Sequence, residues 1–243
     1  MTKKKKQKSS KKTPLAKANI QELQESRNGG QIALRGYSYQ FLYSCNLILS
    51  SSTDTVFTLE GIEDIDTIKC CDGNRTITHI QLKYSSQRQD ANFMDDVLKN
   101  YLETYLIDKN RYFKLVYDFF VAAGNLSKLF SGNLDKNSRD FWKTKIDNIK
   151  KETSLWNWSN FNFEDFIQRL SFENIKKDSL DASIKDSLIK NFEINTDNIS
   201  LFANGIKLLC FDKMERRGEI SRHDITKSVE QKTSQRPGSN SPL

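Results

Sequence analysis

An Asp-Gly pair at positions 72 and 73 separates two segments of strand-forming sequence. Residues 64–69 and 76–83 are rich in β-branched side chains and alternate in character, which is typical of strands. Asp-Gly favours a two-residue turn, because both central positions of that turn need a positive φ. The sequence therefore predicts a tight antiparallel hairpin at this point of the chain.

The two-residue turn also sets the register of the hairpin. It places Asp64 opposite Gln81 and Asp66 opposite His79, with Lys83 diagonally across from Asp64. Side chains alternate faces along a strand, so these five residues share one face. A longer turn would shift the pairs, and a bulge would be needed to restore the face. The hairpin is thus expected to gather carboxylates, an amide and an ammonium group in one patch.

The chemistry of this patch suits hydrolysis of a phosphodiester bond. Carboxylate and amide oxygens are ligands that Mg²⁺ prefers, and a nearby lysine can position the attacking water or stabilise developing charge. We expect Asp64 to be the main metal ligand because it faces Gln81, and Glu60 to bind a second metal or orient the first. Asp66 either shares in metal binding or only pairs with His79. A polar strand face of this kind can equally be the solvated side of a hairpin.

Three motifs carry a family resemblance: GGQIALRGYSYQ at residues 29–40, EGIEDID at residues 60–66 and QLK at residues 81–83. Together they resemble the PD-(D/E)xK nuclease superfamily. More narrowly, they resemble the double-stranded DNA endonuclease domain that heads many bacterial anti-phage effectors. These include effectors of cyclic-oligonucleotide-based systems (CBASS) in which a SAVED sensor domain follows the nuclease.

The resemblance implies roles for individual residues. Asp64 would be the metal-binding aspartate, Gln81 would occupy the Glu/Gln position and Lys83 would be the catalytic lysine. Glu60 and Gln40 would line the same site. The implied cofactor is Mg²⁺ or Mn²⁺, and the implied substrate is double-stranded DNA.

The acidic segment departs from the family pattern, because it reads Glu-Asp-Ile-Asp rather than a simple adjacent pair of aspartates. The choice of main ligand therefore lies between Asp64 and Asp66. Hairpin pairing and the resemblance both favour Asp64, which leaves Asp66, Glu63 and His79 in supporting or surface roles. Arg35 is expected to contact a DNA phosphate or to bond a helix end. Gln40 is expected to contact DNA from the site that it lines.

Four segments are expected along the chain. Residues 1–27 form a lysine-rich disordered arm, residues 28–135 an α/β nuclease core, residues 136–231 a helical subdomain packed on that core, and residues 232–243 a flexible tail. The core is expected to be restriction-endonuclease-like, with a helix, a three-stranded antiparallel meander, a helix and a strand. Aromatic residues between positions 156 and 163 are expected to pack the helical subdomain rather than to stack on bases.

The net charge of +7 resides in the arm, because seven lysines among the first twelve residues leave 31 basic and 31 acidic residues elsewhere. The arm includes Lys3, Lys4, Lys5 and Lys6. It is expected either to raise the affinity for DNA or to keep the chain soluble. The folded body is expected to bind DNA through local patches only.

The sequence contains no apolar run long enough to cross a membrane, and its lysine-rich start lacks the apolar stretch of a secretion signal. Its four cysteines have neither zinc-ligand nor disulfide-framework spacing. These features predict a cytoplasmic protein. The resemblance further implies an endonuclease that is activated by a sensor protein or by self-association. The alternative is a catalytically inactive nuclease-fold subunit that binds DNA or scaffolds a defence complex.

Overall fold

The computed structural model describes residues 29–71 and 73–234. The arm at residues 1–27, Asp72 and the last nine residues lie outside the described part. The chain divides into two units, residues 1–35 and 36–243, and helix α2 (Gly29–Ser50) begins in the first and continues in the second.

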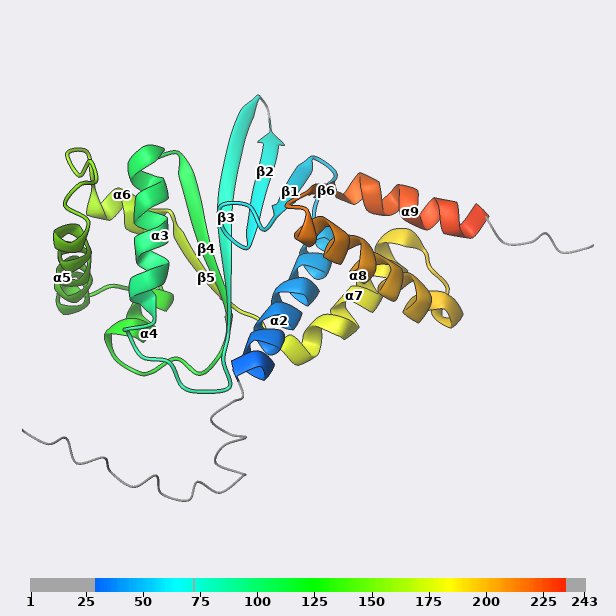
Figure 1. Cartoon of the computed structure of the whole chain (residues 1–243), viewed down its shortest axis with the longest axis horizontal. Coiled ribbons are helices and arrows are strands. Elements are labelled where there is room, and N and C mark those ends of the chain that lie inside the picture. Colours follow the sequence, from blue (N-terminus) through cyan, green and yellow to red (C-terminus); the bar gives the residue numbers. More distant parts are fainter. Residues whose placement is uncertain (1–28, 72, 235–243) are drawn as a thin grey trace, which may run out of the picture. The chain divides into compact units, whose positions relative to one another are not determined.

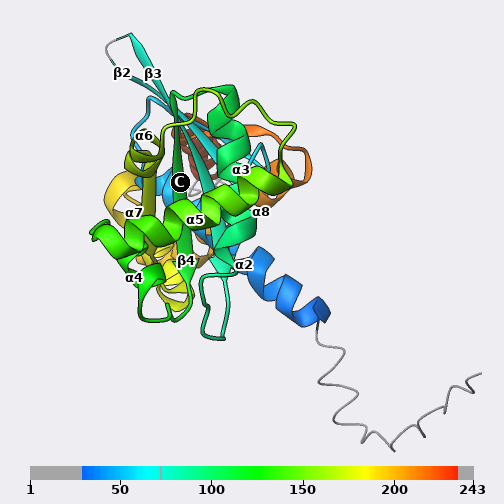
Figure 2. The ribbon, with the colours of Figure 1, turned by 90° about the vertical axis from the view of Figure 1, so that its left-hand side faces the viewer.

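The hairpin forms in the predicted register. Strand β2 (Ile65–Cys71) pairs with β3 (Asn74–Tyr84) from Ile65 opposite Ile80 to Cys71 opposite Asn74. Asp66 lies opposite His79 as expected, and Gly73 has a φ of +78°. A side chain at that position would be strained, so the glycine explains why the turn is tight. The hairpin extends past the neighbouring strands (Figures 1 and 2).

One mixed sheet organises the second unit, with strand order β5-β4-β3-β2-β1-β6. Strands β1, β2 and β3 form an antiparallel meander, β4 and β5 continue parallel to β3, and β6 is antiparallel to β1. The remaining strands are β1 (Thr55–Leu59), β4 (Arg111–Asp118), β5 (Leu170–Asn174) and β6 (Glu219–Ser221).

The predicted order of helix, three antiparallel strands, helix and strand is present as α2, β1 to β3, α3 and β4. The α/β class is therefore confirmed. The other helices are α3 (Met94–Ile107), α4 (Asn125–Phe130), α5 (Lys136–Glu152), α6 (Phe163–Gln168), α7 (Lys177–Phe192), α8 (Ile199–Glu215) and α9 (Arg222–Ser234), with a short 3-10 turn at Thr196–Asn198. Within the described residues, no helix combines the length and apolarity needed to cross a membrane.

Each face of the sheet carries its own apolar core, because side chains alternate along the strands. Phe113 and Leu115 of β4 join a core with α3, α5 and α6, whereas Val116 joins a core with α2, α7 and α8. Figure 1 shows these two groups of helices on either side of the sheet. On β3, Ile80 and Leu82 belong to the α2 side. Because side chains alternate, the β3 residues on either side of Leu82 and Ile80 point to the α3 side of the sheet.

The prediction of helices alone between residues 136 and 231 is wrong at two points. Strand β5 follows α6 almost directly and pairs with β4, and β6 precedes α9 and pairs with β1. Strands of five and three residues give too few alternations for a period to be recognised. They are stabilised by partners far away in the sequence, and local pattern does not reveal such partners.

Candidate functional site

A tight loop between β1 and β2 carries three carboxylate residues. The loop closes where the Glu60 amide donates to the Asp64 carbonyl over 3.0 Å. Glu60 itself has a φ of +55°, which a non-glycine residue rarely adopts. A Cβ at Gly61 would lie 2.2 Å from Asp66 Oδ2, so any larger residue there would displace the Asp66 carboxylate. The loop carries Glu60, Glu63 and Asp64 to the edge of β2, next to β3.

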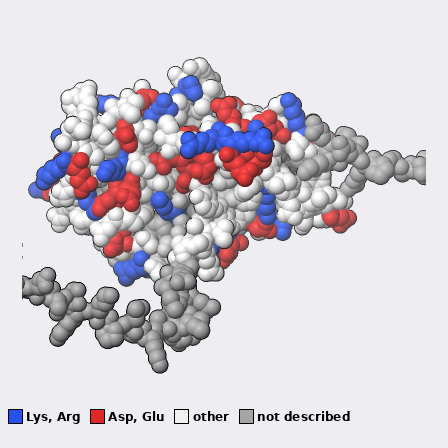
Figure 3. All heavy atoms as spheres, viewed as in Figure 1, with Lys and Arg blue, Asp and Glu red and all other residues white. Residues whose placement is uncertain are grey.

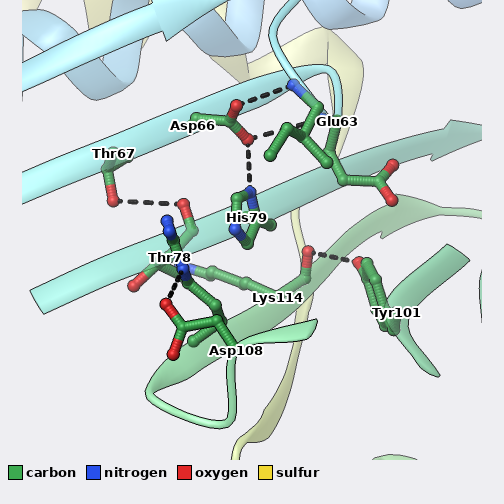
Figure 4. Close-up of polar contacts among 10 residues, drawn as sticks. Glu63, Asp66, Thr67, Thr78, His79, Tyr101, Asp108 and Lys114 are labelled. Atoms are coloured by element: carbon green, nitrogen blue, oxygen red, sulfur yellow. Dashed lines mark hydrogen bonds and ion pairs between the residues drawn. The ribbon is translucent and has the colours of Figure 1, made fainter. Parts of the chain in front are cut away.

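Asp66 holds this loop in place. Its Oδ2 accepts the Ile62 amide at 2.7 Å, and its Oδ1 accepts the Glu63 amide at 3.4 Å and contacts His79 Nδ1 at 2.6 Å. The His79 ring is buried and stacks on Phe113, with centroids 5.9 Å apart. Figure 4 shows Asp66 between the loop backbone and this ring. Of the two roles left open for Asp66, its contacts support the pairing with His79, since both carboxylate oxygens are already engaged.

Asp64 differs from Asp66 in its surroundings. Its Oδ2 accepts a hydrogen bond from the Leu82 amide of β3 over 2.6 Å. This bond fixes the carboxylate at the β3 backbone, at the residue that follows Gln81. Burial raises the pKa of Asp64 to about 6, although the Leu82 amide and Lys83 both act in the opposite direction. Strand β2 starts one residue later, at Ile65. Asp64 thus contacts the β3 backbone at Leu82 from the loop rather than as a residue of strand β2.

Glu63 is the residue that sequence reasoning missed. It was expected in a supporting or surface role, but it is only 8% exposed. Burial, followed by the neighbouring charge of Asp64, raises its pKa to about 7, while Lys83 opposes the shift. A loop has no alternating faces, so the strand pattern gave no reason to place Glu63 inward. Gly61, which interrupts the acidic segment, is the signal that would have suggested a loop.

Gln40 and Glu60 form the outer part of this cluster. Gln40 is buried on α2, and its Nε2 donates to Glu60 Oε1 over 3.1 Å. Burial raises the pKa of Glu60, and Arg217 partly offsets that effect. Gln40 was expected to line the site and to touch DNA; its observed contact is with Glu60.

The amide of Gln81 provides the test of whether these residues suit a metal ion. Its Oε1 is buried and has no hydrogen-bond partner among the described residues. A buried acceptor without a donor is unfavourable unless something else binds it, and Mg²⁺ prefers oxygen ligands. Within residues 29–71 and 73–234, no three acidic, histidine or cysteine side chains cluster closely enough to hold a metal ion by themselves. Besides Asp64 and Gln81, a bound hard cation would therefore need oxygen ligands from water or substrate.

The predicted DNA contacts fall in other places. Arg35 is exposed on the part of α2 that belongs to the first unit, and its contact with DNA stays a prediction. The lysines at positions 3 to 6, namely Lys3, Lys4, Lys5 and Lys6, lie outside the described residues. On the face that Figure 3 displays, basic and acidic side chains are interspersed, in keeping with the charge balance outside the arm.

Comparison with known proteins finds relatives by structure alone. No protein-family model matches the chain, and no curated protein matches its sequence. One similar solved structure is the Cap4 SAVED/CARF-domain containing receptor of Moraxella osloensis, with 15% sequence identity and a TM-score of 0.53. Another is the Cap4 SAVED/CARF-domain containing receptor of Acinetobacter baumannii, with 14% sequence identity and a TM-score of 0.54. The alignments cover 82% of this chain and 47% and 48% of those chains. The shared property is the fold. The chain spans about half the length of each receptor.

Proposed function

We propose that this chain is a metal-dependent endonuclease that hydrolyses phosphodiester bonds of DNA. The observation that supports the proposal most strongly is the buried Gln81 Oε1, which has no partner among the described residues. It belongs to the strand whose Leu82 amide binds Asp64, and Lys83 follows on the same strand. An acid, an amide oxygen and an ammonium group at one strand end are the groups that such a hydrolysis needs.

Each of these side chains has a distinct task in the proposed reaction. Asp64 and Gln81 would hold Mg²⁺ or Mn²⁺, which when bound polarises a phosphoryl oxygen and lowers the pKa of the attacking water. Lys83 would stabilise the charge that develops on the phosphate. Burial raises the pKa of the Glu63 carboxylate, and this residue would accept a proton from that water.

We propose that this activity serves anti-phage defence. The motifs resemble the nuclease domain of anti-phage effectors, and the similar solved structures are Cap4 receptors, two of them holding cyclic trinucleotides. We propose that cleavage is weak for the dilute chain and increases when a sensor partner or self-association brings copies together.

Cleavage of supercoiled plasmid DNA tests the proposal directly. We expect nicked and linear products with Mg²⁺ or Mn²⁺, more of them as the protein concentration rises, and none with EDTA. An absence of metal-dependent cleavage at every protein concentration, with a folded protein, would refute an intrinsic nuclease activity. It would leave the catalytically inactive DNA-binding or scaffold subunit as the proposal, provided that the protein still binds duplex DNA.

A second candidate is a receptor for a cyclic oligonucleotide. It is favoured by the description of the similar structures as receptors, two of which hold cyclic trinucleotides. Calorimetric titration with 3'3'3'-cAAA separates the two candidates. Micromolar or tighter binding without DNA cleavage would support the receptor, whereas metal-dependent cleavage without binding of the trinucleotide would support the nuclease.

A further inference from the structure

The carboxyl ends of two parallel strands meet at Lys83. On β3 and β4, Lys83 lies beside Tyr117 near the point where both strands end. The two loops that follow are joined by backbone hydrogen bonds, from the Gln89 amide to the Phe120 carbonyl and from the Ala122 amide to the Gln89 carbonyl, both 3.0 Å long. In α/β sheets, ligands bind beyond the carboxyl ends of parallel strands. The joined loops therefore stand where a ligand of this sheet is expected.

A cavity of about 310 Å³ opens between these loops and α3, and Lys83 forms part of its wall. Another part is aromatic: Tyr84, Phe93 and Phe119 line it, and the last two pack edge to face with centroids 5.0 Å apart. The volume lies at the lower end of the range for pockets that hold small ligands, about 300 to 1,000 Å³. An aromatic wall of this kind suits a flat ring.

The rest of the wall is polar and carries an acid. Ser85, Gln89 and Asp96 line it, and the Gln89 side-chain amide donates to Ser85 Oγ over 2.9 Å. Lys83 and Asp96 are the charged residues of the lining, so the cavity has no net positive charge. A carboxylate repels phosphate but accepts hydrogen bonds from an exocyclic amino group. The interior is therefore suited to a nucleobase, and Lys83 to the phosphate next to it.

Near this cavity, an arginine stacks on an exposed aromatic ring. Phe120, which follows the lining residue Phe119, is 68% exposed. The Arg88 guanidinium carbon lies 5.6 Å from the centroid of its ring. An exposed ring with a cation over it is a recurrent element of surfaces that track single-stranded nucleic acid, because the ring stacks on bases and the cation binds phosphates.

We infer that the cavity beside Lys83 binds one unstacked nucleobase of the DNA strand being cut, and that Arg88 and Phe120 hold the neighbouring nucleotides. The inference rests on the proposed nuclease function and narrows its substrate. A paired base is not available to the cavity, and a mismatched or single-stranded base leaves the stack more easily than a paired one. The chain is thus a binder of DNA with locally unpaired bases.

Fluorescence anisotropy of labelled 25-mers tests this inference, with Ca²⁺ in place of Mg²⁺ so that binding is measured without cleavage. The full chain should bind single-stranded DNA and a duplex with a central mismatch about tenfold more tightly than a perfect duplex. Phe120→Ala and Asp96→Asn should each remove most of that preference. Two exposed positions on other helices provide matched controls, Phe211→Ala and Asp186→Asn, and these should behave like the wild type.

Equal affinities for the three DNAs, or equal losses in the test and control variants, would overturn the inference. The result is independent of catalysis. A wild-type protein that shows the preference but never cuts DNA in Mg²⁺ would refute the proposed nuclease and support the base-binding cavity. A protein that cuts DNA in Mg²⁺ but shows no preference would support the nuclease and refute the cavity.

Discussion

Replacing Asp66 by alanine should unfold the protein at a clearly lower temperature and inactivate it as well. The substitution leaves the Ile62 amide and His79 Nδ1 without the acceptor that they reach at 2.7 and 2.6 Å, and the weaker 3.4 Å bond from Glu63 is lost too. A hydrogen bond to a charged group contributes about 1.5 to 3 kcal/mol, so the two short bonds account for about 3 to 6 kcal/mol. For a domain of this size, that loss corresponds to a Tm lower by about 6 to 24 °C.

Differential scanning calorimetry of purified Asp66→Ala measures this effect. Asp66→Asn keeps one acceptor oxygen but no charge, so about half of the loss is expected. The matched control Asp186→Ala removes an exposed helical carboxylate and should change the Tm by less than 2 °C, since such surface changes stay within about 0.5 kcal/mol. A Tm for Asp66→Ala that equals the control would refute the role of Asp66 in holding the loop.

Two further predictions concern pH and metal ions. Burial raises the pKa of Glu63 from 4.5 to about 7. Between these two values the folded state therefore binds more protons than the unfolded state, and stability falls as the pH rises. Glu63→Gln should remove that loss, so the variant should be more stable than the wild type at pH 8 by up to about 3 kcal/mol, with little difference at pH 4. Urea unfolding at both pH values measures the difference in stability. Equal stabilities at pH 8 would contradict the prediction. Mn²⁺ at 100 times its Kd should stabilise the wild type by about 2.7 kcal/mol and the Asp64→Asn variant by much less. A thermal-shift assay with and without Mn²⁺ measures this difference. Identical increases in Tm for the two proteins would place the metal elsewhere.

The part of the fold that short-range chemistry determines was predictable. Asp72-Gly73 allowed one tight turn, and the register from Ile65 to Cys71 followed from it. The apolar spacing in the segment that forms α3, where Val97, Tyr101 and Leu102 are buried, likewise indicated a helix. Each of these features depends on residues that are neighbours along the chain.

Long-range contacts explain what was missed. The buried position of Glu63 results from a loop that folds around Asp66, and Asp66 is placed by His79 of the next strand. The alternation rule that selected Asp64 and Gln81 applies to strands only, so it said nothing about a residue of the loop. Likewise, β5 and β6 are short edge strands whose partners are distant in sequence. The cavity beside Lys83 depends on two loops that meet only in the folded chain.

Plasmid cleavage in Mg²⁺ by Lys83→Ala, compared with the wild type and with Lys227→Ala, tests the central claim most directly. Lys227 is an exposed lysine of α9 that lies outside the proposed site. All three proteins are assayed at the same high concentration, after their Tm values have shown that they are folded. The account predicts that Lys83→Ala cuts at least about 100-fold more slowly than the wild type, while Lys227→Ala cuts normally. Cleavage by Lys83→Ala at the wild-type rate would contradict it.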